Sequence, residues 1–136
     1  MRKRIFFAVL AVLFSGLNPA LLGTDSFCVF ITTQQLYHSS DVVFTGVVES
    51  QELDTFVQPR IVWKGGSRGN DVKLQRAPLL KQGVEYLIFA ASSEGDSFKV
   101  AECAEIWEVN SVAGQRRIKD LNTLYHPVWW ALPKKK

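Results

Sequence analysis

The stretch Asp41-Val42-Val43-Phe44-Thr45-Gly46-Val47-Val48 decides the fold class of this chain. Its β-branched and aromatic residues are typical of a β-strand. Gly46, in the middle of the stretch, predicts a bulge or a sharp bend, because a residue without a Cβ admits close approaches that other residues forbid. A small closed barrel needs such bends to turn its corners. The stretch therefore favours a small antiparallel barrel.

Four more strands are expected after this one, each bounded by turn-forming residues. Val84–Ala91 is nearly continuous in apolar residues, which predicts a strand buried on both faces. Gly95-Asp96 predicts a hairpin turn that leads into the last strand. Pro59 places part of the second strand at an edge or a bulge. The four expected strands are Thr55–Trp63, Asp71–Gln75, Val84–Ala91 and Ser97–Cys103.

Two helices are expected at the ends of this strand series. Thr32 or Thr33 can cap a short helix that ends near Ser40. A helical stripe runs through Gln115–Tyr125, where Ile118, Leu121 and Leu124 or Tyr125 recur at helical spacing. We therefore predict a mainly β fold: a five-stranded Greek-key barrel of the OB type, with a short N-terminal helix and a C-terminal helix. An immunoglobulin-like sandwich needs about seven strands, and the sequence does not supply that many.

The N-terminus has the pattern of a secretory signal peptide. Met1-Arg2-Lys3-Arg4 precedes the apolar run Ile5–Phe14, and Ser15–Pro19 follows it. Ten apolar residues rise about 15 Å as a helix, against roughly 30 Å of hydrocarbon in a bilayer. The alternative is an uncleaved N-terminal anchor. We predict a signal peptide over residues 1–23, a domain over 24–126, an irregular tail over 127–136, and a secreted or periplasmic location.

The charge balance argues against a nucleic-acid partner. The chain has 16 Lys and Arg against 13 Asp and Glu, and three of the cations are Arg2, Lys3 and Arg4. Residues 1–23 hold no acid, so removing them leaves 13 of each sign and a neutral protein. A nucleic-acid binder needs a basic face to neutralise phosphates. We therefore expect no nucleic acid among its partners.

The two cysteines, Cys28 and Cys103, agree with export. In an oxidising compartment two cysteines in a domain of this size predict one disulfide. The alternative is a pair of unpaired buried thiols. A zinc site would need two more ligands, and the chain offers only His38 and His126. We therefore expect no metal and no cofactor.

Four segments in order resemble the inhibitory domain of the tissue inhibitors of metalloproteinases, and most closely the short bacterial members of that group. They are Ser40–Val48, Arg60–Gly65, Gly83–Ala90 and Phe98–Cys103. The resemblance covers roughly Ser26 to Tyr125. It implies an OB barrel with flanking helices and a ridge near the N-terminus that docks a metalloproteinase.

The family's mature chain begins with Cys-X-Cys, whose first residue chelates the protease zinc through its α-amino group and carbonyl. Here the triplet reads Ser26-Phe27-Cys28. Cys28 and Cys103 match the family's second disulfide, whereas Ser26 replaces one half of the first disulfide and residues 77–80 lack the other half. A zinc-chelating terminus must be held rigidly, because ordering a free end opposes binding. We therefore expect weak metalloproteinase inhibition or none.

No catalytic constellation is recognisable. His38 lies in the expected first helix without a nucleophile at a familiar spacing, and His126 precedes Pro127. We predict a non-enzymatic binding module that docks an extracytoplasmic protein through a ridge and adjacent loops. Its ridge residues are Ser26, Phe27, Cys28, Val29 and Phe30. The alternative is an envelope-associated structural or interaction protein that contacts a membrane or a partner through Trp129 and Trp130, beside the cluster Lys134-Lys135-Lys136.

Overall fold

The computed structural model describes residue 28, residues 31–65 and residues 70–131. The chain divides into two units, Met1–Phe30 and Ile31–Lys136. In the first unit only Cys28 is described. The predicted signal peptide, and the ridge residues Ser26, Phe27, Val29 and Phe30, lie outside the described residues, as does the lysine cluster of the tail.

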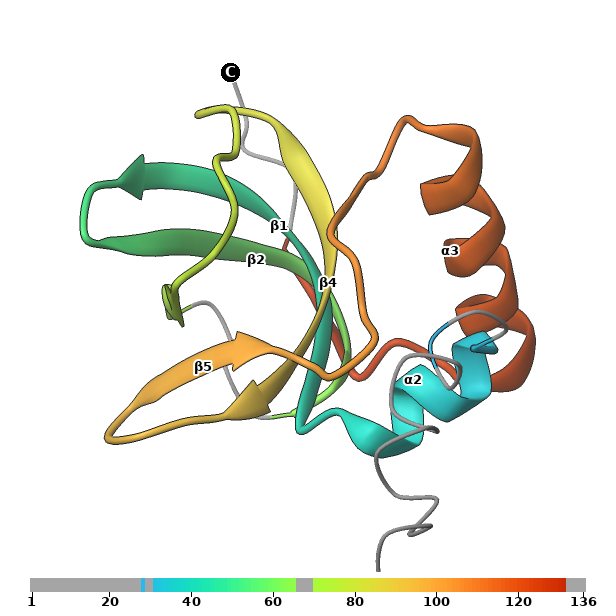
Figure 1. Ribbon diagram of the computed structural model, residues 1–136. Coiled ribbons are helices and arrows are strands. Elements are labelled where there is room, and N and C mark those ends of the chain that lie inside the picture. The colour runs from blue at the N-terminus through green and yellow to red at the C-terminus, as the bar shows by residue number, and fades with distance from the viewer. Residues whose placement is uncertain (1–27, 29–30, 66–69, 132–136) are drawn as a thin grey trace, which may run out of the picture. The chain divides into compact units, whose positions relative to one another are not determined.

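Five strands of the second unit close into a ring (Figure 1). They are β1 Val42–Gln51, β2 Asp54–Lys64, β3 Val72–Gln75, β4 Glu85–Ser92 and β5 Ser97–Val100. Their order is β1-β2-β3-β5-β4, and β4 pairs back with β1. The pairings within the ring are antiparallel except that of β3 with β5, which is parallel. The prediction of a mainly β fold with five principal strands is confirmed.

Strand β4 is buried on both faces, as its sequence predicts. Tyr86, Ile88 and Ala90 belong to the core cluster inside the ring. Leu87 and Phe89 alternate with them and pack in a second cluster with residues of the helices, including Leu36 and Leu121. The period of two in a strand sends neighbouring side chains to opposite faces. A strand between two apolar layers therefore needs a continuous apolar run.

Gly46 lies at a bulge between β1 and β2. The register shifts between Thr45 and Gly46, whose partners in β2 are Ile61 and Pro59. A Cβ on Gly46 would lie 2.4 Å from Cγ1 of Val57. Real side chains do not approach this closely, so the close contact of the two strands requires glycine here. The predicted bend at Gly46 and the predicted bulge at Pro59 are the same irregularity.

Two helices cover one side of the ring (Figure 1). Helix α2, Thr33–Ser39, begins at an N-cap, Thr32, whose hydroxyl accepts a hydrogen bond from the Gln35 amide. The Gln35 side chain accepts in return from the Thr32 amide, which completes a capping box. Helix α3, Val112–Leu124, is capped by Ser111 and begins three residues before the expected start at Gln115.

Polar contacts lock the two helices together and to the ring. Arg117 of α3 donates to Thr33 Oγ1, at 3.0 Å, and to the Ile31 carbonyl, at 3.1 Å. Thr33 Oγ1 in turn donates to Asp120 Oδ2, at 2.8 Å. The buried Trp63 of β2 donates its indole N–H to Asn122 Oδ1, at 3.0 Å. The helices are therefore fixed parts of the fold.

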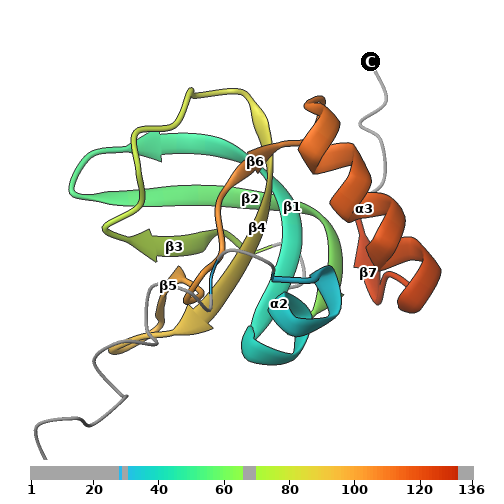
Figure 2. The ribbon, with the colours of Figure 1, turned by 45° about the vertical axis from the view of Figure 1, so that its right-hand side comes forward.

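Two very short strands were not expected from the sequence. Strand β6, Trp107–Glu108, pairs with β4 (Figure 2). Strand β7, Trp129–Trp130, pairs with β2, so two residues of the segment predicted as an irregular tail lie in a strand. The Val128 amide donates to the Val62 carbonyl, and the Ala131 amide donates to the Arg60 carbonyl, both at 2.7 Å. This pairing satisfies backbone groups of β2 that its pairing with β3 leaves open.

Candidate functional site

Cys28 and Cys103 form a disulfide, which confirms the predicted bond. Cys103 follows β5 and has a φ of 66°, in the left-handed region. Cys28 is exposed, and it is the one described member of the predicted ridge.

Two leucines stand out on loops at one end of the ring. Leu53, in the turn between β1 and β2, is 97% exposed, and Leu79, in the loop between β3 and β4, is 94% exposed. Phe56 of β2 is also partly exposed nearby in the sequence. We call Leu53 and Leu79 the loop tips. Figures 1 and 2 both draw the β3–β4 loop running across the β1–β2 hairpin.

The side chain of Gln51 joins these two loops. Its Nε2 donates to the Pro78 carbonyl at 2.7 Å and to Thr55 Oγ1 at 2.9 Å. Its Oε1 accepts from the Leu80 amide at 2.8 Å. Gln51 thus holds the residues on both sides of Leu79 against the hairpin that carries Leu53. Both loop tips are positioned before any partner arrives.

Further hydrogen bonds hold the rest of the β3–β4 loop. The Gly83 amide donates to the Val48 carbonyl at 2.9 Å. Gln82 Nε2 donates to the Glu49 carbonyl at 2.7 Å. The Lys81 amide donates to the buried Tyr86 hydroxyl at 2.9 Å. The loop is therefore fastened to β1 and β4 along much of its length.

The paired tryptophans of β7 point to different surroundings. Trp129 is partly buried and packs against the core cluster inside the ring. Trp130 is 59% exposed, and Val128, which lies two residues before it, is also exposed. Alternation along the strand places Val128 and Trp130 on the same outward side. Of the two tryptophans predicted as a possible tail contact, Trp130 is the exposed one.

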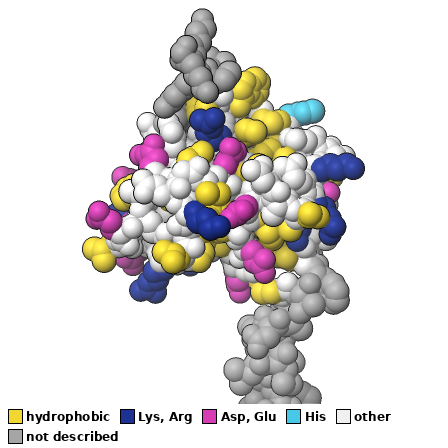
Figure 3. Space-filling view, turned by 90° about the horizontal axis from the view of Figure 1, so that it is seen from above, with side chains coloured by type: hydrophobic (Ala, Val, Ile, Leu, Met, Phe, Trp, Pro, Cys, Tyr) yellow, Lys and Arg dark blue, Asp and Glu magenta, His cyan; other side chains and the backbone are white. Residues whose placement is uncertain are grey.

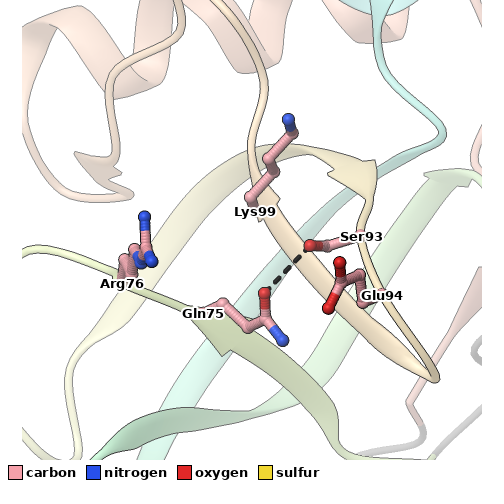
Figure 4. Close-up of a pocket in the computed structure, with 5 residues that line it drawn as sticks. All are labelled: Gln75, Arg76, Ser93, Glu94 and Lys99. Carbon is pink, nitrogen blue, oxygen red and sulfur yellow. Dashed lines mark hydrogen bonds between the residues drawn. The ribbon is translucent and has the colours of Figure 1, made fainter.

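A hollow of about 540 Å³ lies between β3 and the β4–β5 hairpin (Figure 4). Its lining residues come from the end of β3, the start of the hairpin turn and β5: Gln75, Arg76, Ser93, Glu94 and Lys99. The Ser93 hydroxyl donates to Gln75 Oε1 at 2.9 Å and joins the two walls. No local pattern in the sequence predicts this hollow, because residues 75 and 99 lie far apart in the chain.

The two histidines, His38 and His126, are both exposed. His38 is exposed and contacts the rings of Tyr37 and Tyr125, which stack with centroids 3.7 Å apart. His126 is exposed beyond α3. Within the described ranges no group of three or more His, Cys, Asp or Glu side chains is placed to hold a metal ion. No helix among these residues is long and apolar enough to span a membrane.

No family model matches the chain, and no curated protein matches it. The likeness to the metalloproteinase inhibitors therefore rests on the four sequence segments alone. The space-filling view in Figure 3 shows hydrophobic, acidic and basic side chains interspersed over one face. The sequence does carry a signal for the loop tips, since neither leucine belongs to an apolar stripe. Leu53 lies between Glu52 and Asp54, and Leu79 follows Pro78.

Proposed function

We propose that this chain is an exported, non-enzymatic protein-binding module of the OB type, and that the loop tips are part of its contact surface. The observation that carries the proposal is the pair Leu53 and Leu79, almost fully exposed on loops that Gln51 clamps together. Exposed apolar side chains that gather on a surface mark interaction sites, and Gln51 fastens to each other the loops that carry these two leucines. Rigid loops lose little entropy on binding.

The ring order supports the OB assignment. An OB barrel is a five-stranded, partly open Greek-key barrel. The order β1-β2-β3-β5-β4 with return to β1, and the short parallel contact of β3 with β5, agree with that description. The segments that resemble the metalloproteinase inhibitors also fall on ring strands: Ser40–Val48 includes most of β1, and Gly83–Ala90 includes most of β4.

Export is supported by two independent features. The basic residues Arg2, Lys3 and Arg4 precede a ten-residue apolar run, as in a signal peptide. The Cys28–Cys103 disulfide fits an oxidising compartment, because cytosolic reductants keep most thiols reduced. The proposed location is secreted or periplasmic.

The proposed partner is an extracytoplasmic protein with apolar pockets for the loop tips, and the resemblance names a metalloproteinase as the first class to test. Docking is separate from inhibition. Ser26 stands where the inhibitors have the cysteine whose terminus chelates zinc, and residues 77–80 hold no cysteine to brace it. A bound protease therefore keeps its activity.

The size of the loop-tip contribution follows from the exposed area. Burying a leucine side chain completely is worth about 1.5–3 kcal/mol. Leu53 and Leu79 are almost fully exposed in the free protein, so each has nearly the whole of this amount to gain. A loss of about 2 kcal/mol corresponds to about a thirtyfold weaker affinity.

The test is a binding measurement on the full exported chain with its disulfide formed. The chain is immobilised and exposed to a panel of purified catalytic domains of extracellular zinc metalloproteinases. Leu53→Ser and Leu79→Ser are each expected to weaken binding about thirtyfold. Val112→Ser is the matched control, because Val112 is also highly exposed but lies on α3, away from the loops.

Protease activity is measured on the same samples. Saturating amounts of the protein should leave peptide hydrolysis largely unchanged. Tight, zinc-competitive inhibition would contradict the inference drawn from Ser26. Absence of binding across the panel would exclude metalloproteinases as the partner class, and equal losses in all three variants would exclude the loop tips as the contact.

A second candidate function is favoured by the outward side of β7. Trp130 is 59% exposed beside Val128, and the sequence ends with Lys134-Lys135-Lys136. An exposed tryptophan next to cations suits contact with an anionic membrane surface. In a vesicle flotation assay with phosphatidylglycerol, Trp130→Ser should then reduce the bound fraction. Equal flotation of wild type and variant would exclude this role.

A further inference from the structure

We propose that the hollow at the β3–β5 junction binds a carboxylate flanked by a peptide amide. This site is separate from the loop tips and does not depend on the function proposed for them. Three observations carry it: the ring is only weakly closed here, two cations without an ion pair among the described residues line the opening, and one of them has an unusual backbone conformation.

The junction is the weakest seam of the ring. Strands β3 and β5 pair through only two residue pairs, Lys73 with Ser97 and Leu74 with Phe98. By contrast β1 pairs with β4 over six residue pairs. Gln75, directly after the last pair, and Lys99 have no strand-pairing partner across the seam in the described residues, and the hollow opens there. A ligand can therefore reach groups that strand pairing covers elsewhere in the ring.

Arg76 and Lys99 supply positive charge at this opening. Both side chains are exposed, and neither forms an ion pair within the part of the chain that the structure describes. In the view of Figure 4 they lie to one side of the Gln75–Ser93 hydrogen bond, and the Glu94 carboxylate lies to the other side. A guanidinium and an ammonium together bind a carboxylate through charge-assisted hydrogen bonds.

The backbone of Arg76 is held in an uncommon conformation. Its φ is 52°, in the left-handed region that non-glycine residues seldom adopt. Arg76 and Cys103 are the described non-glycine residues with positive φ. Such conformations cost free energy and cluster at functional sites. Arg76 with this backbone conformation is one of the residues that line the hollow.

Glu94 narrows the class of ligand. A single carboxylate in the lining disfavours ligands with several negative charges, such as phosphorylated or sulfated ones, because like charges repel. The Glu94 carboxylate favours a ligand that carries an N–H group, because it can accept a hydrogen bond from that group. Gln75 Nε2 remains a donor, since its Oε1 accepts from Ser93. A ligand with a carboxylate beside an amide can therefore bind the cations, the Gln75 amide and the Glu94 carboxylate at once. Such a ligand is a peptide with an acidic side chain, or a peptide with a free C-terminus.

The experiment uses the full exported chain, labelled with ¹⁵N and with its disulfide formed. Three probes are titrated: Ac-Gly-Glu-Gly-NH₂, Ac-Gly-Gln-Gly-OH and the neutral Ac-Gly-Gln-Gly-NH₂. The amides of residues 75, 76, 93, 94 and 99 should shift saturably with at least one acidic probe and not with the neutral one. The first probe reports a side-chain carboxylate, and the second reports a C-terminal carboxylate.

Variants identify the cations that are responsible. Arg76→Asn removes the charge but tolerates a left-handed backbone, so folding is preserved. Arg76→Asn and Lys99→Gln should each weaken binding about threefold to tenfold, whereas Arg76→Lys should retain most of it. Lys119→Gln, on the exposed side of α3, is the charge-matched control and should have no effect.

The outcomes separate this proposal from the docking function. Leu53→Ser and Leu79→Ser should bind the acidic probe like the wild type. No saturable shift with either acidic probe would overturn the proposal. So would equal shifts with the neutral probe, or unchanged affinity in both Arg76→Asn and Lys99→Gln.

Discussion

Replacing Gly46 with alanine is the most direct test of how the ring is built. The φ of Gly46 is not positive, so alanine can adopt its backbone conformation. The obstacle is space. The added Cβ would lie 2.4 Å from Val57 Cγ1, 2.8 Å from the Gln58 carbonyl oxygen and 3.1 Å from Phe44 Cε2. The substitution therefore measures the closeness of β1 to β2 at the bulge.

The magnitude follows from which neighbours can move. Overpacking a well-packed core usually costs about 1–3 kcal/mol. Val57 is fully buried, and the Gln58 carbonyl belongs to a backbone whose register with β1 is set at Val47. Neither can yield without disturbing strand pairing, so we expect about 3 kcal/mol of destabilisation, at the upper end of the range. For a domain of about 100 residues this lowers Tm by roughly 12–24 °C.

Thermal and urea unfolding of the full exported chain measure this effect. Gly95→Ala is the control, because Gly95 has a φ of 67° but open space around it, so alanine there adds backbone strain without a clash. Combining Gly46→Ala with Val57→Ala should destabilise less than the sum of the two single changes, since one of the clashing groups is gone. A Gly46→Ala protein within about 0.5 kcal/mol of wild type would refute the reasoning.

Three further predictions concern stability. Thr45→Val should stabilise the protein by about 1 kcal/mol in urea unfolding, because the Thr45 hydroxyl is buried without a hydrogen-bond partner in the described structure. A loss of stability would mean that this hydroxyl does form a hydrogen bond. Trp129→Ala should lower Tm clearly, whereas Trp130→Ala should leave it nearly unchanged, since only Trp129 packs against the core; equal effects would contradict this assignment. Replacing Cys28 and Cys103 by serine should lower the free energy of unfolding by up to about 4 kcal/mol, the loop-closure value for roughly 75 residues. An unchanged Tm after chemical reduction of the disulfide would show that the bond adds no stability.

Local patterns predicted the main elements because their causes are local. The continuous apolar run Tyr86–Ala90 predicts a strand between two apolar layers, whichever strands lie beside it. Thr32 and Gln35 form a capping box within four residues, so the start of α2 is visible in the sequence. Ser111 also caps α3, but the stripe of apolar residues begins later, which explains the late predicted start.

Long-range pairing lies outside what such patterns report. Strand β7 is two residues long, too short for any period, and it exists because β2 offers unpaired backbone groups at Arg60 and Val62. The clamp at Gln51 joins it to Pro78 and Leu80, which lie 27 and 29 residues away in the chain. No window of sequence contains both partners.

The sequence by itself determined a mainly β chain, the positions of its five principal strands, the need for a bend at Gly46 and the pairing of its two cysteines. Only the tertiary structure decided the order in which the strands close, the clamp that holds the loop tips and the hollow that Arg76 and Lys99 line at the seam. The physical reason is the range of the forces involved. Side-chain period and capping act within a few residues, whereas strand register and loop packing depend on groups that only folding brings together.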